Sequence, residues 1–264
     1  GVFSRADIPG TKLLVAWGSN PQVNSFPLAK AVIGLKERGG TIIVIDPRNT
    51  QAAQKLADIY LRPRVGTDGA LAHAMARVII ENGWCDYDFI DKYVHGFEAY
   101  KDYVMKFDLN TAEKITGVPG EDIFRVARLF ATTDPSVVMP SNSITHRING
   151  YNNHRAIISL NIITGRYDRP GTAFPERDTY CHSDGGFISL EKEFIDAVRP
   201  RTSKPAVGTE RFPLWKEMVD EGQGMALADQ ILSGKPYELK AAACFGVNHR
   251  MYPDSKRFLE ALDK

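Results

Sequence analysis

The most constraining feature of this sequence is a short run of β-branched residues at Thr41–Ile45, of which the last four are apolar. The run follows Gly39-Gly40 and stops at Asp46-Pro47. A continuous apolar run with turn residues on both sides is typical of a parallel strand that is covered on both faces. Because helices provide that cover in a parallel sheet, the run favours an α/β architecture.

The segments around this run alternate in the same way. Apolar runs also cover residues 12–17 and Ile59–Leu61, and helical patterns cover residues 26–38 and 50–57 between the strands. This βαβαβ order predicts a Rossmann-like, doubly wound parallel sheet. We expect further helices beginning near residues 68, 87, 97, 119 and 151, and a further strand at Ser136–Pro140 followed by a polar loop over residues 141–150.

The character of the chain changes after residue 170. Residues 171–210 are rich in Gly, Pro, Asp and Arg and show little periodicity, which predicts a long irregular excursion. Later patterns predict helices at residues 214–219, 226–232 and 254–262, and an apolar strand at residues 239–245. We therefore expect an N-terminal lead-in at 1–11, a Rossmann-like dinucleotide-binding domain at 12–170, and a partial second α/β domain at 171–264.

Composition excludes several classes of function. Of the 264 residues, 33 are basic and 32 acidic, so the formal net charge of +1 provides no general field for nucleic acid. No run is long and apolar enough for a membrane span, and we expect no direct membrane insertion. The three cysteines are far apart and form no CxxC pair, which argues against a disulfide framework, a structural zinc site or a ligated iron–sulfur cluster within this chain. Cytoplasm and periplasm both remain open.

Polar clusters follow the predicted strands, where ligands bind in open α/β sheets because strand ends meet helix N-termini there. Gly18 allows close backbone approach, and the amides after it can hold a pyrophosphate. Asp46 can accept hydrogen bonds from ribose hydroxyls or a guanine edge. Taken singly, these residues can equally be an ordinary turn and a cap. Neither GxGxxG nor GxxxxGK[ST] is present, which disfavours an ordinary NAD or P-loop site.

Taken together, the clusters are more specific. In order along the chain they are WGSNP (17–21), IDPR (45–48), GTDGALAHAM (66–75), ITGVPGEDI (115–123), LNIITGR (160–166) with RPG (169–171), and FGVN (245–248). This series resembles the molybdopterin oxidoreductases of the dimethyl sulfoxide reductase family, which includes formate dehydrogenases, nitrate reductases and thiosulfate or polysulfide reductases. The resemblance runs from about residue 13 to the C-terminus and is weakest across residues 172–235.

The resemblance implies a cofactor and a set of residues that bind it. In this family, molybdenum or tungsten is held by two molybdopterin guanine dinucleotides, each bound by one of two pseudo-symmetric α/β domains. By similarity, Gly18, Ser19 and Asn20 approach the phosphates of one dinucleotide. Its guanosine end meets Asp46, Arg48, Gly66, Thr67 and Asp68, and its pterin meets Asn142 and His146. Gly246 and Asn248 match the loop for the second dinucleotide.

The sequence departs from the family pattern at two of these positions. The family often has Gln where His146 stands, and it usually has Asn-Pro where this chain has Asn248-His249. Arg147, Arg166 and Arg169 offer positive charge to an anionic cofactor, although ion pairing with Asp168 or with surface carboxylates is the alternative. His73, in the middle of a predicted helix, has the position of a structural residue.

The resemblance also implies parts of the family's enzymes that lie elsewhere. The iron–sulfur segment and the protein ligand to the metal normally precede the WGSNP-like motif, and a barrel-like domain normally follows. We therefore expect an internal piece of a larger catalytic subunit, with no catalytic residue or metal ligand of its own and no redox activity alone. Its expected partners are the remainder of that subunit and an iron–sulfur electron-transfer subunit.

The reaction implied for the whole enzyme is two-electron redox or oxygen-atom transfer, of the thiosulfate or polysulfide reductase type or of the formate dehydrogenase type. Two alternatives remain open at the level of sequence. One is a homologue that keeps the fold but has lost the metal and serves as a structural subunit of a respiratory complex. The other is an unrelated nucleotide-binding module that uses the same βαβ site.

Overall fold

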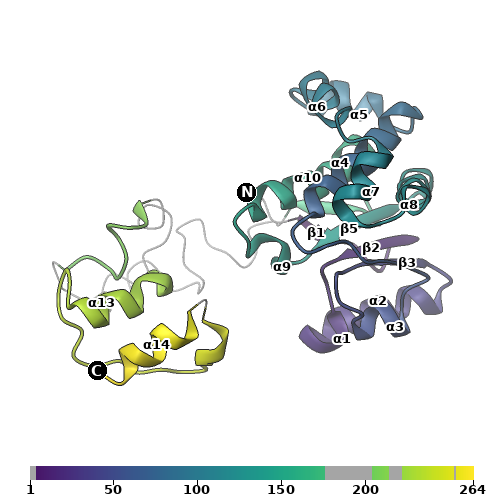
Figure 1. Cartoon of the computed structure of the whole chain (residues 1–264). Coiled ribbons are helices and arrows are strands. Elements are labelled where there is room, and N and C mark those ends of the chain that lie inside the picture. The colour runs from purple at the N-terminus through teal and green to yellow at the C-terminus, as the bar shows by residue number, and fades with distance from the viewer. Residues whose placement is uncertain (1–3, 176–203, 214–221, 253) are drawn as a thin grey trace, which may run out of the picture. The chain divides into compact units, whose positions relative to one another are not determined.

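The computed structural model describes residues 4–175, 204–213, 222–252 and 254–264 (Figure 1). The chain divides into two compact units, Gly1–Glu176 and Arg177–Lys264.

The first unit is built on a sheet of four parallel strands. They are β2 (Leu13–Trp17), β3 (Thr41–Ile45), β4 (Ile59–Leu61) and β5 (Ser136–Pro140), in the order β4-β3-β2-β5. Trp17 lies opposite both Ile45 and Pro140, so these strands end at the same level. The predicted α/β sheet is confirmed, and its carboxyl ends meet along one edge.

Helices cover both faces of this sheet (Figure 1). One face carries α1 (Pro21–Asn24), α2 (Phe26–Glu37) and α3 (Gln51–Lys55), and the other carries α4 (Asp68–Glu81), α8 (Gly120–Thr132) and α10 (Gly150–Ile163). Successive β2 residues alternate between the two cores, since Val15 packs among the second set of helices and Leu14 among the first. Both residues are fully buried. The apolar runs therefore become strands because both of their faces are covered.

Three shorter helices lie on the outer side of α4 (Figure 1). They are α5 (Tyr87–Tyr93), α6 (Phe97–Val104) and α7 (Leu109–Thr116). The first two were predicted, and α7 was not. Its sequence mixes polar and apolar residues, and it begins with Asp108, whose carboxylate accepts a hydrogen bond from the Thr111 backbone N–H at 2.8 Å.

One open edge of the sheet is closed by a side chain. Among the described strands, β5 has only β2 as a neighbour in this sheet. On its other side, Asn161 of α10 donates from Nδ2 to the Val138 carbonyl and accepts from the Val138 N–H at Oδ1, both at 2.9 Å. The asparagine amide thus takes the place of a further strand at that residue.

A small antiparallel pair lies outside the predicted domain range of 12–170. Strand β1 (Ser4–Ala6) pairs with β6 (Ala173–Pro175). The Asp7 carboxylate accepts a hydrogen bond from the Gly171 N–H at 2.7 Å, which joins the two ends of the first unit. The sequence pattern did not indicate these strands because Ser-Arg-Ala and Ala-Phe-Pro, unlike Ile59–Leu61, are not continuous apolar runs.

The described part of the second unit is helical. It contains two 3-10 turns, η1 (Gly224–Ala226) and η2 (His249–Met251), and the helices α13 (Leu227–Ser233) and α14 (Ser255–Leu262). The helices predicted at 226–232 and 254–262 are confirmed to within two residues. The Tyr252 and Phe258 rings stack at 4.0 Å, and Arg257 pairs with Asp229 of α13. The helix predicted at 214–219 falls outside the described residues.

The strand predicted at residues 239–245 is wrong: these residues form no strand, and Phe245 is 89% exposed. A strand needs a neighbour for its backbone N–H and C=O groups. The described residues of this unit include no strand that could provide one.

Among the described residues, no helix combines the length and the apolar character needed to cross a membrane.

Candidate functional site

The carboxyl edge of the sheet gathers the predicted residues of the first unit. Backbone hydrogen bonds continue the ladder past the strand ends: Gly18 N–H to Ile45 O at 2.7 Å, Asp46 N–H to Leu61 O at 3.1 Å, and Ser141 N–H to Trp17 O at 2.9 Å. The loops after β2, β3, β4 and β5 therefore leave the sheet side by side. This is the position at which open α/β sheets bind ligands.

The loop after β2 begins with Gly18, whose φ of +63° lies in the left-handed region that favours glycine. A Cβ here would lie 2.7 Å from Ser143 Oγ, and that hydroxyl donates to the Gly18 carbonyl at 2.8 Å. Within the described residues, the backbone N–H groups of Ser19 and Asn20 donate no hydrogen bond. They are the donors that an anionic ligand needs at this edge.

Asp46 follows β3 and is 3% exposed. Its Oδ1 accepts from the Arg48 N–H at 2.8 Å, and the Arg48 guanidinium lies 3.9 Å away. Burial raises the pKa of Asp46, Arg48 opposes the rise, and the charge of Asp68 adds to it. No described residue donates to Asp46 Oδ2. Oδ2 is not a buried atom, so it stays open to solvent or to a ligand at this edge.

Asp68 is the first residue of α4 and is 6% exposed. Its Oδ1 accepts from the indole Nε1–H of Trp17 at 2.9 Å, and Trp17 is fully buried. Thr67 precedes α4 but does not cap it with its side chain, because its hydroxyl donates to the Arg64 carbonyl at 2.7 Å. Gly66, with φ of +87°, faces open space.

The loop after β5 contains a short helix, α9 (Asn142–Thr145), where a polar loop was predicted. Asn142 and His146, the two residues matched to the pterin, lie at its two ends and are exposed. Gly246 and Asn248 belong to the second unit. Gly246 has φ of +65°, and the Asn248 side chain accepts from the Arg250 N–H at 3.1 Å, which caps η2.

Two of the three candidate arginines lie at the opposite edge of the sheet. Arg166 and Arg169 pair with Asp134 at 3.2 and 2.9 Å. Arg166 also donates at 3.1 Å to Ser136 Oγ, and Ser136 is the first residue of β5. This cluster therefore lies at the amino end of the strand and adds no charge at the carboxyl edge. Arg147 is exposed in the loop after β5.

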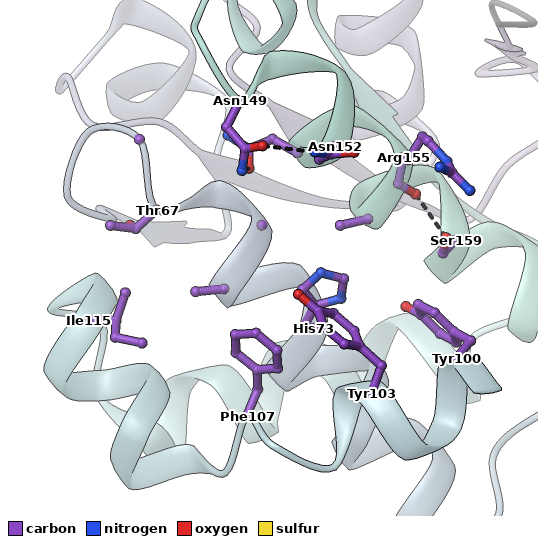
Figure 2. A pocket seen from close by; sticks show the side chains of 15 residues that line it. Thr67, His73, Tyr100, Tyr103, Phe107, Ile115, Asn149, Asn152, Arg155 and Ser159 are labelled. Atoms are coloured by element: carbon purple, nitrogen blue, oxygen red, sulfur yellow. Dashed lines mark hydrogen bonds between the residues drawn. The ribbon is translucent and has the colours of Figure 1, made fainter. Parts of the chain in front are cut away.

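A cavity of about 650 Å³ opens among α4, α6 and α10 (Figure 2). Of the predicted residues, only Gly66 and Thr67 line it. The other lining residues are mostly aromatic or polar, with four small or aliphatic ones among them, and had no recognisable spacing in the sequence: Gly69, Ala70, His73, Tyr100, Tyr103, Phe107, Ile115, Asn149, Asn152, Asn153, Arg155, Ala156 and Ser159.

His73 lies in an aromatic cluster on one side of this cavity (Figure 2). Its ring centroid lies 5.1 Å from that of Tyr103 and 4.9 Å from that of Phe107. His73 Nδ1 and the Tyr100 hydroxyl oxygen are buried without a hydrogen-bond partner among the described residues. Burial lowers the pKa of His73 to about 4, so this side of the cavity is uncharged at neutral pH.

We expect His73 to make the stability of the first unit depend on pH. A histidine whose folded pKa is lowered favours folding fully above its unfolded pKa, and this contribution is lost as the pH falls toward the folded value. Between pH 7 and pH 4, the wild type should therefore lose about 3 kcal/mol more than His73→Phe. Denaturant titrations of both proteins at both pH values measure this difference, and equal losses would contradict it.

Comparison with known proteins identifies the family to which the chain belongs. The model of the molybdopterin oxidoreductase family matches residues 3–206. The chain belongs to the molybdopterin oxidoreductase family, which is a family of enzymes. Membership implies a pterin cofactor that carries molybdenum or tungsten.

Three relatives illustrate this membership. The α subunit of an F420-dependent formate dehydrogenase from Methanocaldococcus jannaschii is 34% identical over 259 residues, covering 97% of this chain and 38% of that protein. Formate dehydrogenase H of Escherichia coli is 33% identical over 172 residues, covering 64% and 24%. The structure of acetylene hydratase from Pelobacter acetylenicus has a TM-score of 0.77 and 26% identity, covering 99% and 38%. The chain thus spans less than two fifths of each relative.

The described residues contain no group of three or more His, Cys, Asp and Glu side chains that could hold a metal ion. The carboxyl edge instead offers hydrogen-bond donors and acceptors of the kind that suit an anionic ligand with polar groups. Ser19 and Asn20 offer backbone donors, and Asp46 and Asp68 offer carboxylate acceptors. Gly18 leaves no side chain between the loops that carry them.

Proposed function

We propose that the first unit binds one molybdopterin guanine dinucleotide along the carboxyl edge of its sheet. The observation that carries the proposal is the convergence of Ser19, Asp46 and Asp68 on adjoining loops at that edge. Scattered turns would not place backbone donors and two buried carboxylates side by side. The range 12–170 would then act as a dinucleotide-binding domain.

Each group at the edge has a distinct task in this proposal. The N–H groups of Ser19 and Asn20 neutralise the phosphates. Asp46, Arg48 and Asp68, with the Gly66-Thr67 turn, bind the guanosine, and the exposed Asn142 and His146 face the pterin. When bound, the metal–pterin group supplies two-electron redox or oxygen-atom transfer. The chain's own contribution is placement.

For the whole protein, we propose the catalytic subunit of a molybdenum or tungsten oxidoreductase. The formate dehydrogenase relatives favour the formate dehydrogenase type over a thiosulfate or polysulfide reductase type. In this proposal, residues 171–264 contribute Gly246 and Asn248 to a second dinucleotide site, and an iron–sulfur cluster lies elsewhere in the subunit. The α-subunit name of the relative supports a further subunit that exchanges electrons.

Replacing Asp46 by alanine in the full-length protein tests the proposal. Losing charge-assisted hydrogen bonds should weaken binding by about tenfold or more. We expect the pterin guanine dinucleotide content of the purified protein to fall, and guanosine diphosphate to bind correspondingly more weakly by calorimetry. Asp91→Ala, an exposed change on α5, is the matched control and should alter neither value.

The two alternatives give different results in the same experiment. Unchanged cofactor content in Asp46→Ala would favour a homologue with a structural role. A wild-type preference for adenosine diphosphate over guanosine diphosphate would favour a different nucleotide-binding module. Either result would overturn the proposal.

A further inference from the structure

We propose that Trp17 is a positioning residue that aims the Asp68 carboxylate at the nucleobase and so gives the site its preference for guanine. This inference rests on the proposed function, and it assigns a role to the indole that the packing of the core alone does not require.

The contact joins two elements that are distant in sequence. Trp17 is the last residue of β2, and Asp68 is the first residue of α4. The indole Nε1–H donates to Asp68 Oδ1 at 2.9 Å, with Trp17 fully buried and Asp68 6% exposed. A fully buried ring is held by its surroundings and cannot follow a moving carboxylate, so the carboxylate must adopt the orientation that the indole imposes.

The two oxygens of Asp68 are therefore not equivalent. Oδ1 is engaged by the indole, whereas Oδ2 accepts no hydrogen bond from a described residue. Oδ2 is not a buried atom, so solvent reaches it. With one oxygen turned inward, the other is directed outward at the edge where the cofactor is proposed to lie.

An outward carboxylate oxygen selects among nucleobases by its chemistry. A carboxylate only accepts hydrogen bonds. Guanine presents two adjacent donors on one edge, the ring N1–H and the exocyclic amine. Adenine has an acceptor at N1 and no amine at C2, so an oxygen placed for the two guanine donors meets the N1 lone pair with repulsion. The discrimination requires the oxygen to point at the base, and this is the task we assign to Trp17.

Asp68→Asn in the full-length protein provides the sharpest test. The indole N–H needs an acceptor, so it should hold the Asn oxygen inward and leave the amide NH₂ pointing outward. An outward NH₂ matches the carbonyl that xanthine has in place of the guanine amine. We expect calorimetry to show the preference moving by about tenfold or more, from guanosine diphosphate to xanthosine diphosphate.

A second pair of variants isolates the indole. Trp17→Phe keeps an aromatic ring but removes the N–H donor. It should weaken guanosine diphosphate binding about tenfold and change adenosine diphosphate binding less than twofold. In the double variant with Asp68→Asn, the amide is free to flip, so the xanthosine preference should largely disappear. Trp84→Phe, a half-buried tryptophan packed on Phe124, is the control and should leave the guanosine preference unchanged.

The outcomes separate the two proposals. If the wild type shows no preference for guanosine diphosphate, the proposed function fails. If it does prefer guanosine, but Asp68→Asn does not turn toward xanthosine, the role of Trp17 is overturned. It is also overturned if the double variant keeps the full xanthosine preference. The Asp68→Asn result remains decisive even if Trp17→Phe does not fold.

Discussion

Replacing Asn161 by alanine should lower the free energy of unfolding of the first unit by about 3–5 kcal/mol. Asn161 is fully buried on α10, and its side chain makes two hydrogen bonds, both 2.9 Å long, to the N–H and C=O of Val138 on β5. Alanine would leave both backbone groups buried without a partner, and it would leave a small cavity beside the strand.

Denaturant unfolding followed by tryptophan fluorescence measures this loss, because Trp17 is buried in the neighbouring strand. Asn152→Ala, an exposed change on the same helix, is the control and should cost less than about 0.5 kcal/mol. Asn161→Asp retains the acceptor but sets a carboxylate oxygen against the Val138 carbonyl, so it should also be strongly destabilising. A loss below about 1 kcal/mol in Asn161→Ala would show that water or a shift of β5 replaces the amide.

Replacing Arg166 by methionine should destabilise the first unit by about 3 kcal/mol. The buried guanidinium donates to three acceptors at 3.1 Å, namely Ala131 O, Thr133 O and Ser136 Oγ. Methionine fills much of the same volume but donates no hydrogen bond. The carbonyls at the end of α8 would then lose partners that no other described side chain is placed to replace.

Arg166→Lys separates charge from geometry, since one ammonium cannot reach three acceptors arranged for a planar fork. It should recover less than half of the lost stability in the same unfolding measurement. Arg125→Met, an exposed change on α8, is the control and should lie within about 0.5 kcal/mol of the wild type. Equal stabilities of Arg166→Met and Arg125→Met would contradict the structural role.

The ion pairs of Asp134 with Arg166 and Arg169 make the stability of the first unit depend weakly on pH. Burial opposes ionisation of Asp134, but Arg169 and Arg166 outweigh it and lower the pKa of that carboxyl. A carboxyl with a lowered pKa stabilises the fold at neutral pH, and this contribution is lost as the pH falls through the lowered value. Because Asp134 is half exposed, solvent screening keeps the contribution small.

Local sequence patterns were sufficient to predict an element wherever the pattern lay within that element. The run at Thr41–Ile45 becomes a central strand because its composition suits burial on both faces. The Gly and Asp residues after the strands gather at one edge because parallel strands end together. Family membership followed from the same short motifs, and the family model confirms it.

Contacts between residues that lie far apart in sequence could be identified only from the tertiary structure. The apolar residues at 239–245 have the composition of a strand, yet the described part of their unit contains no strand to pair with them. Arg166 suits an anionic ligand by composition, but the fold places it at the amino end of β5 against Asp134. The indole donor of Trp17 lies in a motif that the sequence singled out, but only the packing of β2 against α4 identifies Asp68 as its acceptor. The composition and hydrophobic periodicity of a segment indicate which secondary structure it can form. A hydrogen bond between distant residues depends instead on which segments the fold brings side by side.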